Sequence, residues 1–248
     1  MIDGAATHGL TRIAAIDQSF FTDRSGGGCI QENKLFCPGW VADNYDRYID
    51  PTLQHLVLVG SAVVAGFLIA FVLAVLAHRN RWLKTPFLAG TGILYTIPSI
   101  SFFFLLLPIT GRGQLTAIIA LTAFNLQIIF RNMTTGLQNV PANVTEAATG
   151  IGMTRSQMLW KVELPLAMPE IIAGLRIATV STVALATLAV FANGGGLGAE
   201  IITGSNITFK TGIIVAGSIA VIMAIVFDGL LLLARKLLAP WERKRVAA

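Results

Sequence analysis

The chain has 248 residues, of which 54% are hydrophobic and only 12% are charged. A soluble globular domain carries about 25% charged residues, so half that share, confined to particular stretches, indicates an integral membrane protein. The formal net charge of +5 could indicate a nucleic-acid partner, but the basic residues cluster beside hydrophobic runs. Orientation in the bilayer explains that clustering better, so we expect an all-α membrane protein and no nucleic-acid binding.

Residues 1–52 precede the first apolar run and are expected to form an extracytoplasmic tail. They contain no apolar run of their own, so no cleavable signal peptide is expected. Both cysteines of the chain, Cys29 and Cys37, lie in this tail. Disulfides persist on an outward-facing segment, so we expect a bridge between them, with two free thiols in a mobile tail as the alternative.

Five uncharged or nearly uncharged runs follow, and each could cross the bilayer as a helix, which takes about 20 apolar residues. The second run is broken by Pro98 and Pro108, and the fifth contains a single acidic residue, Asp228. Pro169 suits a first helical position, so the fourth helix is expected to begin there. The five runs cover residues 56–77, 85–111, 113–130, 177–199 and 211–234.

The basic residues outside these runs predict how the chain is oriented. With five spans, residues 78–84, 131–176 and 235–248 lie on one side and hold twelve Lys and Arg residues, against six on the other side. The positive-inside rule then places the N-terminus outside and the C-terminus in the cytoplasm. We therefore expect a transmembrane domain at 53–235 with a cytoplasmic loop at 131–168, and a basic cytoplasmic tail at 236–248.

The chain carries no motif that predicts chemistry of its own. A G-x-S-x-G nucleophile elbow, a phosphate-binding G-x-x-x-x-G-K-[ST] loop and a His/Cys cluster for a metal are all absent from the sequence. His8, His55 and His78 lie outside the middle of the runs, so they cannot form a proton relay with acidic residues. We therefore expect no enzyme activity, metal or cofactor in this chain and interpret it as part of a path across the membrane.

Polar or kinked positions within the runs are candidate pathway residues. Pro98 removes a backbone hydrogen bond in mid-helix, and such breaks are tolerated where protein or a cavity satisfies the backbone. The glycine run at 194–198 should end the fourth helix in a turned or mobile segment at the outer mouth. Packing alone could explain any of these positions. The candidates are Tyr95, Pro98, Ser99, Asn125, Asn193 and Gly195.

Two ionisable residues lie inside or close to the fourth and fifth runs. Arg176 lies seven residues beyond Pro169, and Asp228 lies seven residues before Arg235, so both should sit at similar depth from the cytoplasmic side. Charges buried in a membrane tend to pair, and we expect an ion pair between Arg176 and Asp228. The alternatives are separate snorkelling to the interface or a contact between Asp228 and Arg131.

A polar insert at residues 143–165 interrupts the apolar pattern, and its first half predicts a short helix. Asn143 can cap this helix, and Glu146, three residues later, favours the positive helix end. Gly150 or Gly152 can end it in the left-handed conformation.

The second half of the insert predicts another short helix. Thr154 and Gln157 have the spacing of a capping box, and Pro165 should end the helix. Each of the two helices is under three turns and too short to be stable alone in water, so we expect a docking partner.

The spacing in this insert resembles the cytoplasmic signature loop of the inner-membrane subunits of ABC-type importers. That pattern is Glu-Ala-Ala, three residues, Gly, nine residues, Ile, one residue and Leu-Pro. The resemblance extends over roughly residues 53–235, and the one departure is Val in the Ile position. The matching residues are Glu146, Ala147, Ala148, Gly152, Val162, Leu164 and Pro165.

The resemblance implies the partners of the chain. In such importers the loop forms coupling helices that sit in a cleft of a separate ATPase subunit. ATP and Mg would then bind to the ATP-binding cassette dimer and not to this chain. Two permease subunits, identical or different, would form the solute path, and an extracytoplasmic binding protein would deliver the solute.

Two stretches narrow the resemblance to the osmoprotectant subgroup, which imports glycine betaine, carnitine, choline or proline betaine. They are "YTIPSISFFFLLLPITGRG" at 95–113 and "NGGGLGAEIITG" at 193–204. Methionine-type permeases share the glycine-rich run, so another ABC importer subgroup remains the alternative. A self-contained secondary transporter is a further alternative, but it would leave residues 143–165 unexplained.

Overall fold

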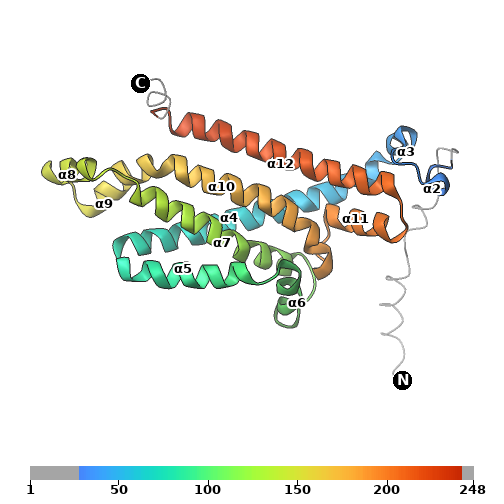
Figure 1. Ribbon diagram of the computed structural model, residues 1–248, viewed down its shortest axis with the longest axis horizontal. Helices are drawn as coiled ribbons and strands as arrows, with labels where there is room; N and C mark the ends of the chain where they lie inside the picture. The colour runs from blue at the N-terminus through green and yellow to red at the C-terminus, as the bar shows by residue number, and fades with distance from the viewer. Residues whose placement is uncertain (1–27, 242–248) are drawn as a thin grey trace.

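The computed structural model describes residues 28–241, and in that part the chain forms helices and no strand. The expected all-α fold class is therefore confirmed. Long helices lie side by side, and short helices gather at the two ends of the molecule (Figure 1). The expected terminal segments at 1–52 and 236–248 fall partly outside the described residues, at 1–27 and 242–248.

Four helical stretches are long and apolar enough to cross a membrane, and they correspond to four of the five predicted runs. The first stretch, Tyr45–Arg79, contains the 3-10 turn η2 (Tyr45–Tyr48) and α4 (Ile49–Arg79). The others are α7 (Gln114–Gln138), α12 (Lys210–Leu238) and the stretch Arg155–Ala192, which contains α10 (Leu164–Ala186) and the 3-10 turn η4 (Thr187–Ala192).

The second predicted run forms two helices instead of one. α5 (Arg81–Thr96) and α6 (Ser99–Thr110) are bent by 99° at a break that contains Pro98. Pro98 has no backbone N–H and precedes the first residue of α6, so the hydrogen-bond ladder of α5 stops there. Pro108 lies inside α6 and does not interrupt it. The described residues thus contain four spanning helices, or five if the bent pair counts as one span.

The fourth helix differs from its predicted bounds at both ends. α10 begins at Leu164, so Pro169 lies inside the helix and the predicted start there was wrong. At the other end the helix stops at Ala192, where Asn193, Gly195 and Gly196 adopt positive φ angles and turn the chain. Part of the predicted run, up to residue 199, belongs to a separate helix, α11 (Leu197–Asn206).

α7 is the central helix, because it contacts α4, α5, α6 and α10. Where α7 comes closest to its neighbouring helices, glycine residues make room for the contact. Gly66 of α4 faces Asn125 of α7, and a Cβ on Gly66 would lie 2.9 Å from the Asn125 Cβ. Gly136 of α7 faces the Ala167 carbonyl of α10, which is 3.1 Å from the Cβ position. Without a hydrophobic driving force between helices in lipid, such packing holds the bundle together.

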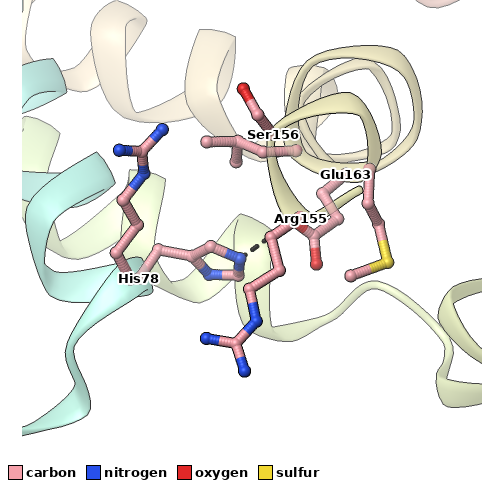
Figure 2. A pocket seen from close by; sticks show the side chains of 7 residues that line it. His78, Arg155, Ser156 and Glu163 are labelled. Carbon is pink, nitrogen blue, oxygen red and sulfur yellow. Dashed lines mark hydrogen bonds and ion pairs between the residues drawn. The ribbon is translucent and has the colours of Figure 1, made fainter. Parts of the chain in front are cut away.

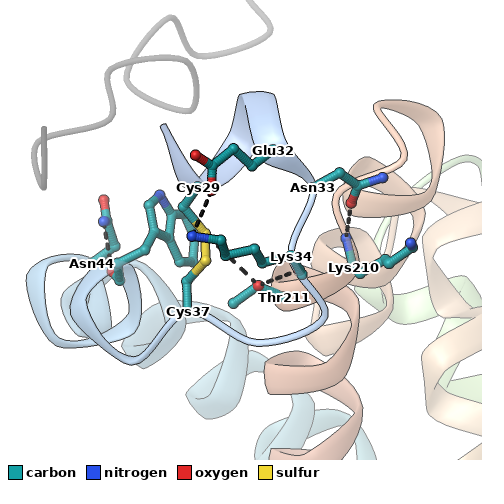
Figure 3. Close-up of a disulfide and its surroundings, with 9 residues drawn as sticks. Cys29, Glu32, Asn33, Lys34, Cys37, Asn44, Lys210 and Thr211 are labelled. Atoms are coloured by element: carbon teal, nitrogen blue, oxygen red, sulfur yellow. Dashed lines mark hydrogen bonds and ion pairs between the residues drawn. A yellow bond between two sulfur atoms is a disulfide. The ribbon is translucent and has the colours of Figure 1, made fainter. Parts of the chain in front are cut away.

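A disulfide-linked cap covers one end of α12. Cys29 in α2 (Cys29–Glu32) is bridged to Cys37, which precedes α3 (Pro38–Asp43). The Thr211 hydroxyl of α12 donates to the Lys34 carbonyl at 3.2 Å, and the Lys210 amide donates to Asn33 Oδ1 at 3.3 Å (Figure 3). The described part of the N-terminal tail is therefore folded against the transmembrane helices.

We expect Gly66→Ala to destabilise the bundle. The added Cβ would meet the Cβ of Asn125, which cannot move without displacing α7, and overpacking of this kind costs about 1–3 kcal/mol. Gly60→Ala is the matched control, because it lies on the same helix with nothing within 4 Å of its Cβ position. Thermal melting in detergent should show a lower midpoint for Gly66→Ala alone. Equal melting of the two variants would contradict close packing at Gly66.

Candidate functional site

The signature loop between α7 and α10 contains the two short helices that the sequence predicts. α8 (Ala142–Gly150) begins directly after Pro141, whose fixed φ of -61° and extended ψ of 134° set the chain for a helix. Asn143 therefore lies inside the first turn, and its predicted role as the cap was wrong. Glu146 follows one turn later on the exposed side of α8.

Gly152 ends α8, and the alternative Gly150 is still helical. The φ of Gly152 is +79°, a left-handed conformation that favours glycine. The Met153 amide donates to the Ala148 carbonyl at 3.1 Å, and the Gly152 amide donates to Thr149 at 3.0 Å. These two bonds form a Schellman motif, which satisfies the last carbonyls of the helix.

α9 (Arg155–Met158) starts with a complete capping box. The Gln157 amide donates to the Thr154 hydroxyl at 3.3 Å, and the Thr154 amide donates to Gln157 Oε1 at 2.9 Å. The loop is therefore locally specified by its own sequence on both sides of Gly152.

α9 does not end at Pro165 as the sequence predicts. It continues through a π-turn, η3 (Leu159–Glu163), directly into α10, and Pro165 occupies the first turn of α10. The Leu164 amide bonds to the Leu159 carbonyl five residues earlier, so the backbone is wider before the proline ring. One helical rod thus joins the loop to the fourth span.

The signature positions divide between the surface and the core of the loop. Glu146, Ala147 and Gly152 are exposed, and the neighbouring Ile151 keeps 75% of its surface accessible. The other signature residues face the protein, with Ala148 and Leu164 buried and Val162 and Pro165 half-buried. The loop therefore presents an exposed surface that combines a carboxylate with apolar groups, on a buried base.

A contact that was not predicted from the sequence ties the loop to the end of α4. His78 Nε2 lies 2.8 Å from Glu163 Oε2, and the Glu163 side chain is buried (Figure 2). In the sequence only the positions of the two residues pointed to this contact, because Glu163 lies between two signature residues and His78 directly follows the first apolar run. Beside the contact is a cavity of about 460 Å³ lined by His78, Arg79, Arg155, Ser156, Met158, Leu159 and Glu163.

Arg176 of α10 and Asp228 of α12 form a bidentate ion pair. Arg176 Nε donates to Asp228 Oδ1 and Arg176 Nη2 donates to Oδ2, both at 2.8 Å. The pair uses both carboxylate oxygens and links α12 to the rest of the bundle halfway along α10. The planar guanidinium and the planar carboxylate make two parallel hydrogen bonds, which fix the orientation of one group relative to the other.

Three of the candidate pathway residues lie at the break between α5 and α6. Tyr95 is in the last turn of α5, Pro98 is at the break itself, and Ser99 is the first residue of α6. Tyr95 and Pro98 are exposed and Ser99 is half-buried, so these residues share one accessible region.

The other three candidates are elsewhere. Asn125 is buried in the core, where its Oδ1 accepts a 2.7 Å hydrogen bond from the Thr182 hydroxyl. Asn193 ends η4 with a φ of 61° and is exposed. Gly195 has a φ of 75° and lies against Gln54 of α4, which also accepts a hydrogen bond from the amide of Gly196.

Residues 62–244 match the protein family described as binding-protein-dependent transport system inner membrane component. The choline transport system permease protein OpuBB of Bacillus subtilis (strain 168) is 37% identical over 196 residues, which cover 79% of this chain and 90% of that protein. The osmoprotectant import permease protein OsmW of Salmonella typhimurium (strain LT2) is 38% identical over 201 residues, with coverages of 77% and 92%. The glycine betaine/carnitine/choline transport system permease protein OpuCB of Bacillus subtilis (strain 168) is 36% identical over 190 residues, with coverages of 76% and 87%.

Two solved structures share the fold. An inward facing conformation of the MetNI methionine ABC transporter matches with a TM-score of 0.69 at 22% identity, covering 77% of this chain and 95% of that chain. An amino acid ABC transporter with histidines matches with a TM-score of 0.68 at 19% identity, covering 79% of this chain and 96% of that chain. At these identities the likeness establishes the fold and leaves the solute open.

We expect that removing one partner of the Arg176–Asp228 pair is more harmful than removing both. Asp228→Leu leaves an unpaired guanidinium in the apolar region, whereas Arg176→Met with Asp228→Leu leaves no charge there. The yield of folded protein, measured by size-exclusion chromatography in detergent, should fall severalfold for each single variant and recover toward wild type in the double variant. A double variant as poor as the worse single variant would contradict this expectation.

Proposed function

This chain belongs to the family of binding-protein-dependent transport system inner membrane components, and we propose that the solute it carries is a quaternary-ammonium osmoprotectant such as choline, glycine betaine or carnitine. The observation that carries the proposal is the agreement among relatives, which are 36–38% identical over most of their length and are choline or osmoprotectant permeases by name. The methionine-type alternative has weaker support, because the MetNI likeness is one of fold at 22% identity.

The chain is a membrane permease subunit, and we infer that the signature loop is its contact with a separate ATPase. The exposed surface around Glu146, Ile151 and Gly152 supports this role. The short helices that carry it are capped by residues of the loop, and the other side of the loop is buried against the protein. The π-turn continues α9 into α10, so a push on the loop acts directly on a spanning helix. ATP and Mg would bind to the ATPase dimer, and this chain would have no enzyme activity of its own.

We infer the orientation from charge and from the position of the disulfide-linked cap. The loop, residues 78–84 and the end of α12 gather at one end of the molecule, whereas the disulfide and α11 lie at the other (Figure 1). The first end carries the excess of basic residues, so we place it in the cytoplasm and the disulfide end outside. With α5 and α6 counted as one broken span, we propose five spans, with the N-terminus outside.

We propose that the solute path lies between two permease subunits, identical or different, and receives its solute from an extracytoplasmic binding protein. The break between α5 and α6 supports this arrangement, because irregular backbone within a membrane lies against protein or a water-filled cavity. The secondary-transporter alternative leaves the exposed signature loop without a role.

Reconstitution tests this function directly. Proteoliposomes that contain the permease with its ATPase and binding protein should accumulate radiolabelled choline or glycine betaine only when ATP is supplied. Accumulation by this chain alone, without ATP or an ATPase, would overturn the proposal in favour of a secondary transporter.

We expect Gly152→Leu to abolish ATP-driven uptake while membrane insertion is preserved. A β-carbon in the left-handed conformation costs about 1–2 kcal/mol, so the turn between α8 and α9 would change shape. Gly152→Asn is the matched control, because asparagine tolerates this conformation better than other residues with side chains. Uptake and membrane content are measured together, and unimpaired uptake by Gly152→Leu would contradict a coupling role for the turn.

A further inference from the structure

Aromatic rings gather where two helices are interrupted. α5 and α6 are bent at Pro98, α10 changes into the 3-10 turn η4, and α6 and η4 are in contact. The rings of Phe104 in α6 and Phe191 in η4 have centroids 6.2 Å apart. Both interruptions thus contribute an aromatic side chain to the same place.

The other ring from this region that stays accessible is Tyr95 in the last turn of α5. Tyr95 packs edge-to-face on Phe124 of α7 at 6.3 Å, and Phe102 does so at 5.7 Å. Phe102 and Phe124 are buried, whereas Tyr95, Phe104 and Phe191 keep 50%, 51% and 37% of their surface accessible. Two buried rings therefore lie beneath the accessible ring of Tyr95, while the accessible rings of Phe104 and Phe191 contact each other.

This region is poorly suited to lipid tails. The first amides of α6 follow Pro98 without a helical acceptor, and α6 has no side-chain cap. Unsatisfied backbone groups are excluded from the hydrocarbon region unless they meet protein or water. The backbone at the break therefore faces a second subunit or an aqueous path, and the three accessible rings lie on α5, on α6 and on η4, which contacts α6.

The chemistry of a quaternary ammonium group limits what can hold it. Such a group carries no N–H donor, so its attraction comes from a carboxylate or from the faces of aromatic rings. Within the five apolar runs Asp228 is the one acidic residue, and Arg176 occupies both of its oxygens. In addition, α12 lies along the opposite edge of the subunit from α5 and α6 (Figure 1). Near the break, the faces of aromatic rings are therefore the groups that can attract the quaternary ammonium cation.

We propose that Tyr95, Phe104 and Phe191 form a contact surface for the quaternary ammonium group of the solute within the path. This inference rests on the proposed function and adds to it the residues that meet the cation. The final carbonyl groups of α5, which ends beside Tyr95, carry the partial negative charge of a helix C-terminus and favour a cation near Tyr95.

The test uses the complete complex of permease, ATPase and binding protein in proteoliposomes, with radiolabelled choline as the probe. Phe104→Leu and Phe191→Leu should each lower the initial rate of ATP-driven uptake about threefold to tenfold, because leucine keeps apolar bulk without a π-face. Phe104→Trp and Phe191→Tyr should keep rates near wild type. Phe67→Leu is the matched control, because it removes a similar ring contact within α4, at 6.1 Å from Phe71, and should leave uptake unchanged.

All rates are normalised to the amount of assembled complex. Leucine variants that transport choline at the wild-type rate would overturn the inference while leaving the proposed function intact. An equal loss in the leucine and the aromatic variants would also overturn it, because packing would then explain the effect. Failure of the wild-type complex to transport either choline or glycine betaine would instead overturn the proposed function itself.

Discussion

Two spanning helices, α4 and α10, lie against α7 at glycine positions where almost no side chain separates them. Lipid tails are as apolar as the side chains, so no hydrophobic effect drives helices together within a bilayer. Close packing holds such helices together instead. Gly66 and Gly136 provide that closeness at two levels of α7. The loop at one end and the helix breaks at the other are both positioned by this packing, since α7 and α10 lead into the loop and α6 rests on α7.

Mechanical continuity distinguishes the fourth span from the other helices. α9, η3 and α10 form one rod from the exposed loop to the η4 turn, where Phe191 meets Phe104. The His78–Glu163 contact connects the same rod to α4, so a movement of the loop would reach two spanning helices at once. In the proposed importer, the ATPase contact and the aromatic surface are therefore at opposite ends of one element.

Local chemistry made much of this structure predictable. The Thr154–Gln157 capping box and the left-handed turn at Gly152 depend on residues within a few positions, which the sequence displays directly. The lengths of the apolar runs likewise predicted four of the spanning helices, but not the bend between α5 and α6. The tertiary context changed the rest. Pro165 continues a helix because the preceding π-turn makes room for its ring, and the His78–Glu163 contact joins residues 85 positions apart. Neither can be read from spacing along the chain.

The continuous rod also makes the direction in which the loop faces depend on the number of residues between the loop and the fourth span. An α-helix advances about 100° per residue, since it has 3.6 residues per turn. A π-turn accommodates one more residue than a turn of α-helix, so deleting one residue from 159–163 and restoring an α-helix would leave the loop facing nearly the same direction. A deletion in the α-helical part of the rod would instead rotate the loop surface with Glu146 and Gly152 by about 100° around the axis of α10. The number of residues in the α-helical parts of the rod therefore sets the direction in which the loop faces, and insertions or deletions there should be tolerated far less than substitutions.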